Sequence, residues 1–384
     1  MANVFDYLDW RGDLGFRADP FNVVDNIIFS MFSYYPFDGI VNDTLDAGAV
    51  SLPEAAKRLI ELIKKDPSIE REFVLGHRQA DFLTRLAETP RYRDCTLRGY
   101  VNKIDICREM QFAVITILTP ETPPYISFRG TDSAIIGWKE DFNMILNYPI
   151  PAQVEAVNYL NDAAKYLEEE IYIGGHSKGG NLAVYASAFC NEPIQKHIKT
   201  IYSNDAPGFS KQIITSDQYK AIEAKIDCYI PESSVVGLLF EYVKNYKVVK
   251  SSESGIMQHD PFSWEIQGKN MVHINSVSKH SIVVNKMLMK WLEDMNHQTR
   301  LTFVETLYDI VNDANIKSVH DFTDNKLKNA ALLIKSLHTV DNESKKMLFK
   351  TFSALFDVAK NNIQSFIDVG ESRAGADEKP RQIS

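Results

Sequence analysis

The spacing of apolar residues changes twice along the chain. Up to about residue 90, apolar residues recur every three or four positions, as they do on amphipathic helices, for example in 21–34, 52–65 and 80–88. Between about 95 and 280, short β-branched and aromatic runs alternate with helical segments. Beyond about 280 the spacing is helical again to about residue 369. The pattern predicts helical regions on either side of a central α/β unit.

The central unit begins with two runs, 97–106 and 112–118, that predict an antiparallel hairpin. Strands alternating with helices then predict a mainly parallel sheet with helices on both faces. The apolar run 233–243 could form a lid or a buried helix, and its length favours the helix. The other strands are expected at 125–129, from 171, and at 200–204, 225–230 and 246–250, and the helices at 151–169, 180–190 and 216–223.

These elements divide the chain into four parts. Residues 1–90 are expected to be an N-terminal helical cover packed on the core, and 91–295 the α/β core. Residues 296–370 are expected to form a C-terminal helical region. The tail, 371–384, is rich in charged and small residues and is expected to be disordered.

Composition narrows the class of protein. A formal net charge of −9 over 384 residues argues against general nucleic-acid binding, because no basic stripe is available to neutralise phosphates. The four cysteines are widely spaced and predict reduced thiols. The first ten residues do not look like a signal peptide, and no apolar run is long enough to span a bilayer. We therefore expect a cytoplasmic protein, with peripheral contact to a membrane left open.

The chemically most informative stretch is Gly175-His-Ser-Lys-Gly179, a G-x-S-x-G motif. It stands between a β-branched and aromatic run and an Ala-rich helical run, which is the strand–turn–helix setting that the motif requires. A serine on such a turn has strained backbone angles, and flanking glycines allow the strand and helix to approach closely. Ser177 is therefore the predicted nucleophile.

Further stretches accompany this motif in a fixed order. Together with Gly174–Ala183 they resemble class 3 lipase-like α/β-hydrolases, and more closely a bacterial branch of that group known only as a domain of unknown function. The likeness spans roughly residues 1–280 and implies an α/β-hydrolase fold and hydrolysis of a small or lipid acyl ester, without naming the substrate. The stretches are Asp9–Asp13, Tyr125–Thr131 with Trp138 and Asp141, Asn204–Phe209 and Gln258–Trp264.

A serine hydroxyl needs a histidine to accept its proton and an acid to orient that histidine. In this fold the chain order is serine, acid, histidine. His259 is favoured as the base because it lies in a loop bounded by Gly and Pro after a predicted strand, and His280 is the reserve. His176, next to the serine, is expected to pack rather than react.

Two residues compete for the role of the acid. Asp205 closes the strand after the nucleophile strand, which is one of the two places where this fold positions its acid. Class 3 lipases use an aspartate after the following strand, where this chain offers only Glu232. Asp205 is favoured, although each residue also has a structural interpretation, as a turn residue or a solvated charge.

The oxyanion hole is expected to combine the main-chain N–H of Lys178 with a donor from Thr131, which has both an N–H and a hydroxyl. Arg129 and Asp141 are expected to form a structural ion pair that shapes this loop.

Other classes of function find less support. There is no H-E-x-x-H motif or Cys/His cluster for a metal and no Walker A or G-x-G-x-x-G motif for a nucleotide, so no metal or cofactor is expected. The sequence predicts a serine hydrolase that cleaves a carboxylic ester. Two alternatives stay open: a non-catalytic binding or regulatory module with this fold, and an acyltransferase or thioesterase. The oligomeric state is not determined by the sequence.

Overall fold

The computed structural model describes residues 1–72, 77–132, 135–144, 149–167, 169–240 and 245–294, together with Gln298 and Glu305. The helical region and tail predicted over 296–370 and 371–384 therefore lie outside the described residues, apart from these two positions. In the part of the chain that is described, no helix is both long and apolar enough to cross a membrane.

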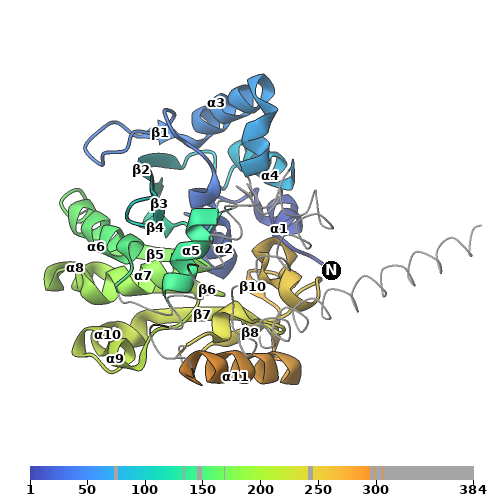
Figure 1. Ribbon diagram of the computed structural model, residues 1–384. Helices are drawn as coiled ribbons and strands as arrows, with labels where there is room; N and C mark the ends of the chain where they lie inside the picture. The colour runs from blue at the N-terminus through green and yellow to red at the C-terminus, as the bar shows by residue number, and fades with distance from the viewer. Residues whose placement is uncertain are drawn as a thin grey trace, which may run out of the picture.

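A nine-stranded sheet runs through the middle of the molecule (Figure 1). Its order is β1-β2-β3-β4-β5-β6-β7-β8-β11, with β4 to β8 parallel and the outer pairs antiparallel. A separate hairpin pairs β9 with β10. The strands are β1 Val50–Ser51, β2 Thr96–Asp105, β3 Met110–Thr119, β4 Thr122–Phe128, β5 Ile171–His176, β6 Ile198–Asn204, β7 Ile226–Pro231, β8 Lys247–Val249, β9 Ile266–Gln267, β10 Asn270–Met271 and β11 His273–Ile274.

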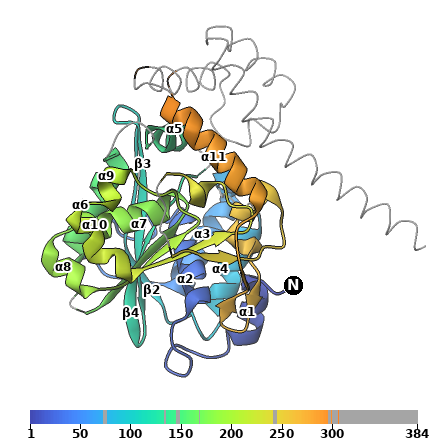
Figure 2. The same cartoon turned by 90° about the horizontal axis from the view of Figure 1, so that it is seen from below.

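Helices cover both faces of this sheet, so the predicted α/β architecture, a mainly parallel sheet with helices on both faces, is confirmed (Figure 2). The N-terminal helices α1 to α4 pack on one face, and α6 to α10 pack on the other. The helices are α1 Val4–Arg11, α2 Val23–Ser30, α3 Leu52–Lys65, α4 His77–Glu88, α5 Ile135–Asn143, α6 Pro151–Ala163, α7 Lys178–Phe189, α8 Glu192–His197, α9 Lys211–Ile214, α10 Asp217–Ile222 and α11 Lys279–Asp294.

The central strands are buried on both sides, which explains their continuous apolar runs. In β3, Val114 packs in the cluster of α6 and α7, whereas Ile115 and Ile117 pack against the N-terminal helices. On that second face, the ring of Phe21 stacks on Tyr172 of β5 with centroids 4.7 Å apart. The N-terminal helices thus complete the core of the sheet.

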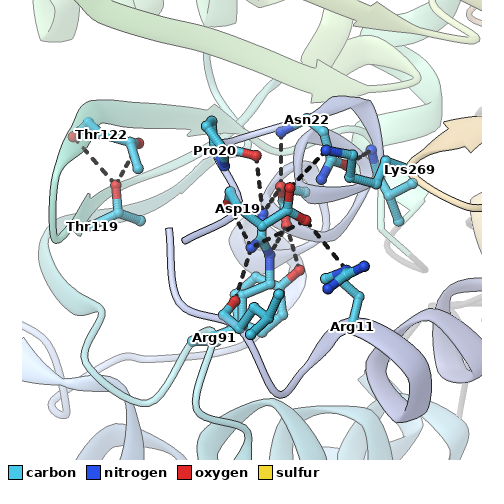
Figure 3. Close-up of polar contacts among 12 residues, drawn as sticks. Arg11, Asp19, Pro20, Asn22, Arg91, Thr119, Thr122 and Lys269 are labelled. Carbon is cyan, nitrogen blue, oxygen red and sulfur yellow. Dashed lines mark hydrogen bonds and ion pairs between the residues drawn. The ribbon is translucent and has the colours of Figure 1, made fainter. Parts of the chain in front are cut away.

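A buried ion-pair network fixes the N-terminal segment in place (Figure 3). Arg91, just after α4, binds both carboxylate oxygens of Asp25 at 2.8 and 2.6 Å and donates to the carbonyl oxygen of Asp19 at 2.9 Å. The Asp19 carboxylate in turn accepts from Lys269 at 2.7 Å and pairs with Arg11 at 3.3 Å. These contacts connect α1, α2 and the β9–β10 hairpin.

The predicted helix boundaries hold where local signals are strong. Helix α3 occupies the predicted 52–65, where Ser51 caps the N-terminus and Pro53 lies in the first turn. Helix α6 ends at Ala163, six residues before the predicted end at 169. The helix expected over 233–243 is wrong in its described part, where only a 3₁₀ turn at Val236–Leu238 forms. The reason lies in the hydrogen bonds of Gly237, which belong to the candidate site.

Candidate active site

The carboxyl ends of neighbouring strands bring the predicted reactive side chains together. Thr131 follows β4, Ser177 follows β5 and Asp205 follows β6. His259 lies in the loop after β8. Because the carboxyl ends of parallel strands meet at one edge of a sheet, these side chains share that edge.

Ser177 occupies a strained turn between β5 and α7. Its φ of 57° and ψ of −134° lie in a region that residues with a side chain rarely adopt. A Cβ added to Gly179 would lie 2.1 Å from the carbonyl oxygen of Phe128, so only glycine allows this close approach of helix and sheet. The Ser177 N–H donates to the carbonyl oxygen of Asn204 at 2.9 Å. Packing therefore stabilises the strained turn, and Ser177 stays partly exposed.

His259 is paired with Asp205. Its Nδ1–H donates to Asp205 Oδ2 at 2.6 Å, and Asp205 is buried. The other oxygen, Oδ1, accepts from the Ser234 hydroxyl at 2.5 Å and from the Gly237 N–H at 3.2 Å. With both oxygens engaged, the carboxylate is fixed in orientation and fixes the ring. Nε2 of His259 is then the nitrogen left to accept a proton.

Ser177 and His259, the predicted nucleophile and base, are connected through His176. No hydrogen bond links Ser177 to His259 in the described residues, and such bonds commonly tighten only when substrate binds. Instead, Nε2–H of His176, the residue before Ser177, donates to the carbonyl oxygen of His259 at 2.7 Å. The two imidazole rings lie 4.4 Å apart. His259 therefore lies beside the turn that carries Ser177.

The other candidates are placed differently. Glu232 is exposed, and its hydrogen bonds to the described residues come from the main chain: its N–H donates to the carbonyl oxygen of Val249, and its carbonyl oxygen accepts from the N–H of Ser278. His280 is exposed on α11. The geometry thus brings Asp205, and not Glu232, to His259. Within the described residues, no group of three or more His, Cys, Asp or Glu side chains is arranged to hold a metal ion.

The loop after β4 passes close to the serine turn. A Cβ added to Gly130 would lie 2.6 Å from the carbonyl oxygen of His176 and 3.0 Å from Cβ of Ser177. The hydroxyl of the next residue, Thr131, donates to Asp141 Oδ2 at 2.5 Å. Of the two donors expected from Thr131, the main-chain N–H is therefore the one left for an oxyanion. Lys178 begins α7, where the first N–H groups have no partner within the helix.

The side chain of Lys178 forms a buried ion pair that the sequence did not indicate. Its Nζ donates to Glu140 Oε2 at 2.9 Å and to the carbonyl oxygen of Gln111 at 3.1 Å. Glu140 also accepts from the N–H groups of Gln111, at 3.0 Å, and Ala152, at 2.9 Å. Both members of the pair are buried. The residue that would supply one oxyanion donor is thus anchored to α5 and β3.

The expected ion pair between Arg129 and Asp141 is wrong. Arg129 pairs with Asp132 at 3.3 Å, whereas Asp141 binds Thr131 and lies 3.9 Å from Nζ of Lys178. The reason is that Asp132 is positioned by Gln111, whose amide N–H donates to it at 2.5 Å.

Several residues that shape the site were missed from the sequence. Ser234, which holds Asp205, stands three positions before a glycine just after a strand, a pattern typical of a serine-stabilised turn. Tyr34 contacts His176, and Glu140 pairs with Lys178, but each is far from its partner in the sequence. No local signal marks these two contacts.

Asp141 makes stability depend on pH. Burial raises the pKa of Asp141 to about 6, even though Lys178 and the Thr131 hydroxyl act to lower it. Because this value exceeds the ordinary 3.8, the folded chain binds a proton at Asp141 more tightly than the unfolded chain does. Stability therefore falls as the pH rises through about 6. We expect Asp141→Asn, which keeps an acceptor for Thr131, to remove this fall. Thermal unfolding should show the variant gaining on wild type between about pH 5 and 7.5; an equal difference at both values would contradict it.

The chain is similar to known proteins both in sequence and in structure. The model of the Mbeg1-like family matches residues 86–309. Among solved structures, the crystal structure of M37 lipase is similar, with a TM-score of 0.34 and 13% sequence identity, over 55% of this chain and 68% of that one. No curated protein matches the sequence.

Proposed function

The chain belongs to the Mbeg1-like family and has a lipase-like α/β-hydrolase fold, and from that premise we propose that it is a serine hydrolase that cleaves a carboxylic ester. The observation that carries the proposal is the 2.6 Å pair of His259 and the buried Asp205 beside the strained turn of Ser177. The strained backbone of Ser177 costs stability, and residues with such strain cluster at active sites, which supports a catalytic role.

The reaction assigned to these residues proceeds in two halves. Ser177 Oγ attacks the ester carbonyl carbon while His259 Nε2 takes the hydroxyl proton, and Asp205 stabilises the imidazolium that forms. The N–H groups of Lys178 and Thr131 would bind the developing oxyanion. The C–O bond to the alcohol then breaks, and His259 gives its proton to the departing oxygen. Water, deprotonated by His259, releases the acid and restores Ser177.

Two other activities would form the same acyl-enzyme on Ser177. A thioesterase differs from an ester hydrolase in the bond that is cleaved, and an acyltransferase differs in the acceptor that attacks the acyl group. A graded series of p-nitrophenyl esters, assayed with and without added alcohols or CoA, compares water with the other acceptors. Faster release of nitrophenol with an added acceptor would favour acyl transfer.

The first experiment uses a fluorophosphonate probe and the same ester series on wild type, Ser177→Ala and His259→Ala. We expect wild type to be labelled and to turn over esters, and Ser177→Ala to lose labelling entirely because it has no nucleophile. His259→Ala should lose roughly 10⁴-fold or more in kcat because the hydroxyl keeps its proton.

The matched control is His280→Ala, which removes an exposed histidine from α11 and should behave as wild type. Circular dichroism of each variant checks that it is folded. Folded wild type that neither labels nor hydrolyses any ester would overturn the proposal and leave a non-catalytic binding module. Loss of activity in His280→Ala but not in His259→Ala would assign the role of the base to His280 instead of His259.

A further inference from the structure

The inference rests on the proposed function. We propose that His176 is a positioning residue that holds His259 in place through the main chain, so that the base stays aligned with Ser177. His176 is buried at the end of β5, and its Nε2–H donates to the carbonyl oxygen of His259 at 2.7 Å. The sequence alone suggested only that this side chain packs.

The contacts of His176 determine which ring nitrogen carries its proton. A carbonyl oxygen can only accept, so Nε2 must be the protonated nitrogen. Burial, and secondarily the neighbouring His259, lower the pKa of His176 well below its usual value, so the ring is neutral. Nδ1 is then a bare acceptor, and the Tyr34 hydroxyl lies 3.2 Å from it and 3.3 Å from the carbonyl oxygen of His176, both of which can accept its proton. Burial raises the pKa of Tyr34, which keeps the phenol protonated as the donor.

The loop that carries His259 is held at two adjacent carbonyl groups. The indole N–H of the buried Trp264 donates to the carbonyl oxygen of Gln258 at 2.8 Å, and His176 holds the next one. Trp264 belongs to the same loop region, so its bond stabilises the loop internally. The hydrogen bond from His176 instead comes from outside this loop, from the residue that directly precedes Ser177. It therefore sets the position of His259 relative to Ser177.

A neutral ring is also what this position requires. During the reaction His259 becomes an imidazolium with its ring 4.4 Å from that of His176. A second cation at that distance would oppose the charge that the reaction creates. A neutral imidazole donates its hydrogen bond without adding charge. A neutral histidine at position 176 is thus long enough to donate to the carbonyl oxygen of His259 and adds no positive charge beside it.

The test compares two replacements of His176. Glutamine places an amide N–H close to the position of Nε2 and keeps the donor, whereas leucine removes it. We expect His176→Leu to lower kcat and the rate of fluorophosphonate labelling by roughly 10- to 100-fold with little change in KM, because misalignment of a base costs rate rather than binding. His176→Gln should stay within about fivefold of wild type. His197→Leu, the same change at an exposed position, is the matched control.

A second measurement does not depend on activity. In ¹⁵N-histidine spectra of the full chain, His176, assigned by its loss in His176→Gln, should appear as the neutral Nε2–H tautomer. In Tyr34→Phe the hydroxyl near Nδ1 is removed, but the carbonyl oxygen of His259 still requires the proton on Nε2, so the tautomer should be unchanged. These spectra of wild type and Tyr34→Phe keep the inference testable even where leucine at 176 prevents folding. An Nδ1–H or charged His176 in wild type would overturn the inference.

The outcomes separate this inference from the proposed function. Active wild type with an equally active His176→Leu would overturn the positioning role and leave the hydrolase intact. Equal losses in the leucine and glutamine variants, matching the fraction of unfolded protein, would make His176 merely structural and would also overturn it. Wild type that does not react with the probe at all would overturn the proposed function, and the positioning role with it.

Discussion

Replacing Asp205 with asparagine is expected to lower kcat by about 10⁴ while the protein stays folded. Asp205 Oδ1 accepts from the Ser234 hydroxyl and the Gly237 N–H, so the asparagine oxygen will take this position. Its amide N–H₂ then faces Nδ1 of His259, which must become an acceptor. The ring proton moves to Nε2, where it blocks proton transfer from Ser177. The loss comes from the tautomer, because the contacts of the acid are otherwise kept.

The measurement is ester turnover and the rate of probe labelling in wild type, Asp205→Asn and Glu232→Gln. Glu232 is exposed, so its variant should keep activity within about twofold of wild type. This comparison tests the two acids that the sequence left open. A large loss of activity in Glu232→Gln together with an active Asp205→Asn would assign the role of the acid to Glu232, after β7. Thermal unfolding of all three proteins shows whether a loss reflects folding.

The sequence predicted the strand–turn–helix at Ser177 because its signals are local. The glycines around Ser177 and the switch from strand to helix lie within about ten residues, and the structure places them as a strained turn with φ of 57°. The order of strands in a parallel sheet then brings Asp205 and His259 to the same edge. Local pattern and topology together were enough to propose the three residues.

What decides between Asp205 and Glu232 could not be seen locally. Asp205 is held by Ser234 and Gly237, which come from a turn after another strand. That turn replaced the helix expected over 233–243, because the N–H of Gly237 is used by Asp205 Oδ1 and Ser234 Oγ. Apolar periodicity describes burial and carries no information about such a hydrogen bond. The hydrogen bonds of Gly237 therefore explain both why the predicted helix is absent from the described residues and how the carboxylate of Asp205 is held.

The same limit applies to Lys178. A charged residue after the nucleophile is usually a solvated side chain, and nothing nearby in the sequence announces its partner. Glu140 is 38 positions away and meets Lys178 because α5 packs beside the start of β3. A buried ion pair depends on tertiary packing, so its partner could not be assigned from the sequence.

This buried pair supports the second large expected effect. Lys178→Met should lower the free energy of unfolding by roughly 3–5 kcal/mol, because Glu140 is left as a buried charge without its cation. Glu140→Gln leaves the cation with only the more distant carboxylate of Asp141, at 3.9 Å, and should also be destabilising. The double variant removes both charges and keeps an amide oxygen for the Ala152 N–H, so it should be more stable than either single variant. Urea unfolding of the four proteins measures the coupling as a double-mutant cycle.

The exposed pair of Lys196 and Glu192, at 3.1 Å on α8, is the matched control. Lys196→Met should change stability by no more than about 0.5 kcal/mol, because water already solvates both charges. Losses that simply add in the double variant would contradict a buried ion pair. Since Lys178 also begins α7, a folded double variant gives a further result. A drop in kcat there, with stability largely kept, would show that the ion pair aligns the oxyanion donor as well as stabilising the fold.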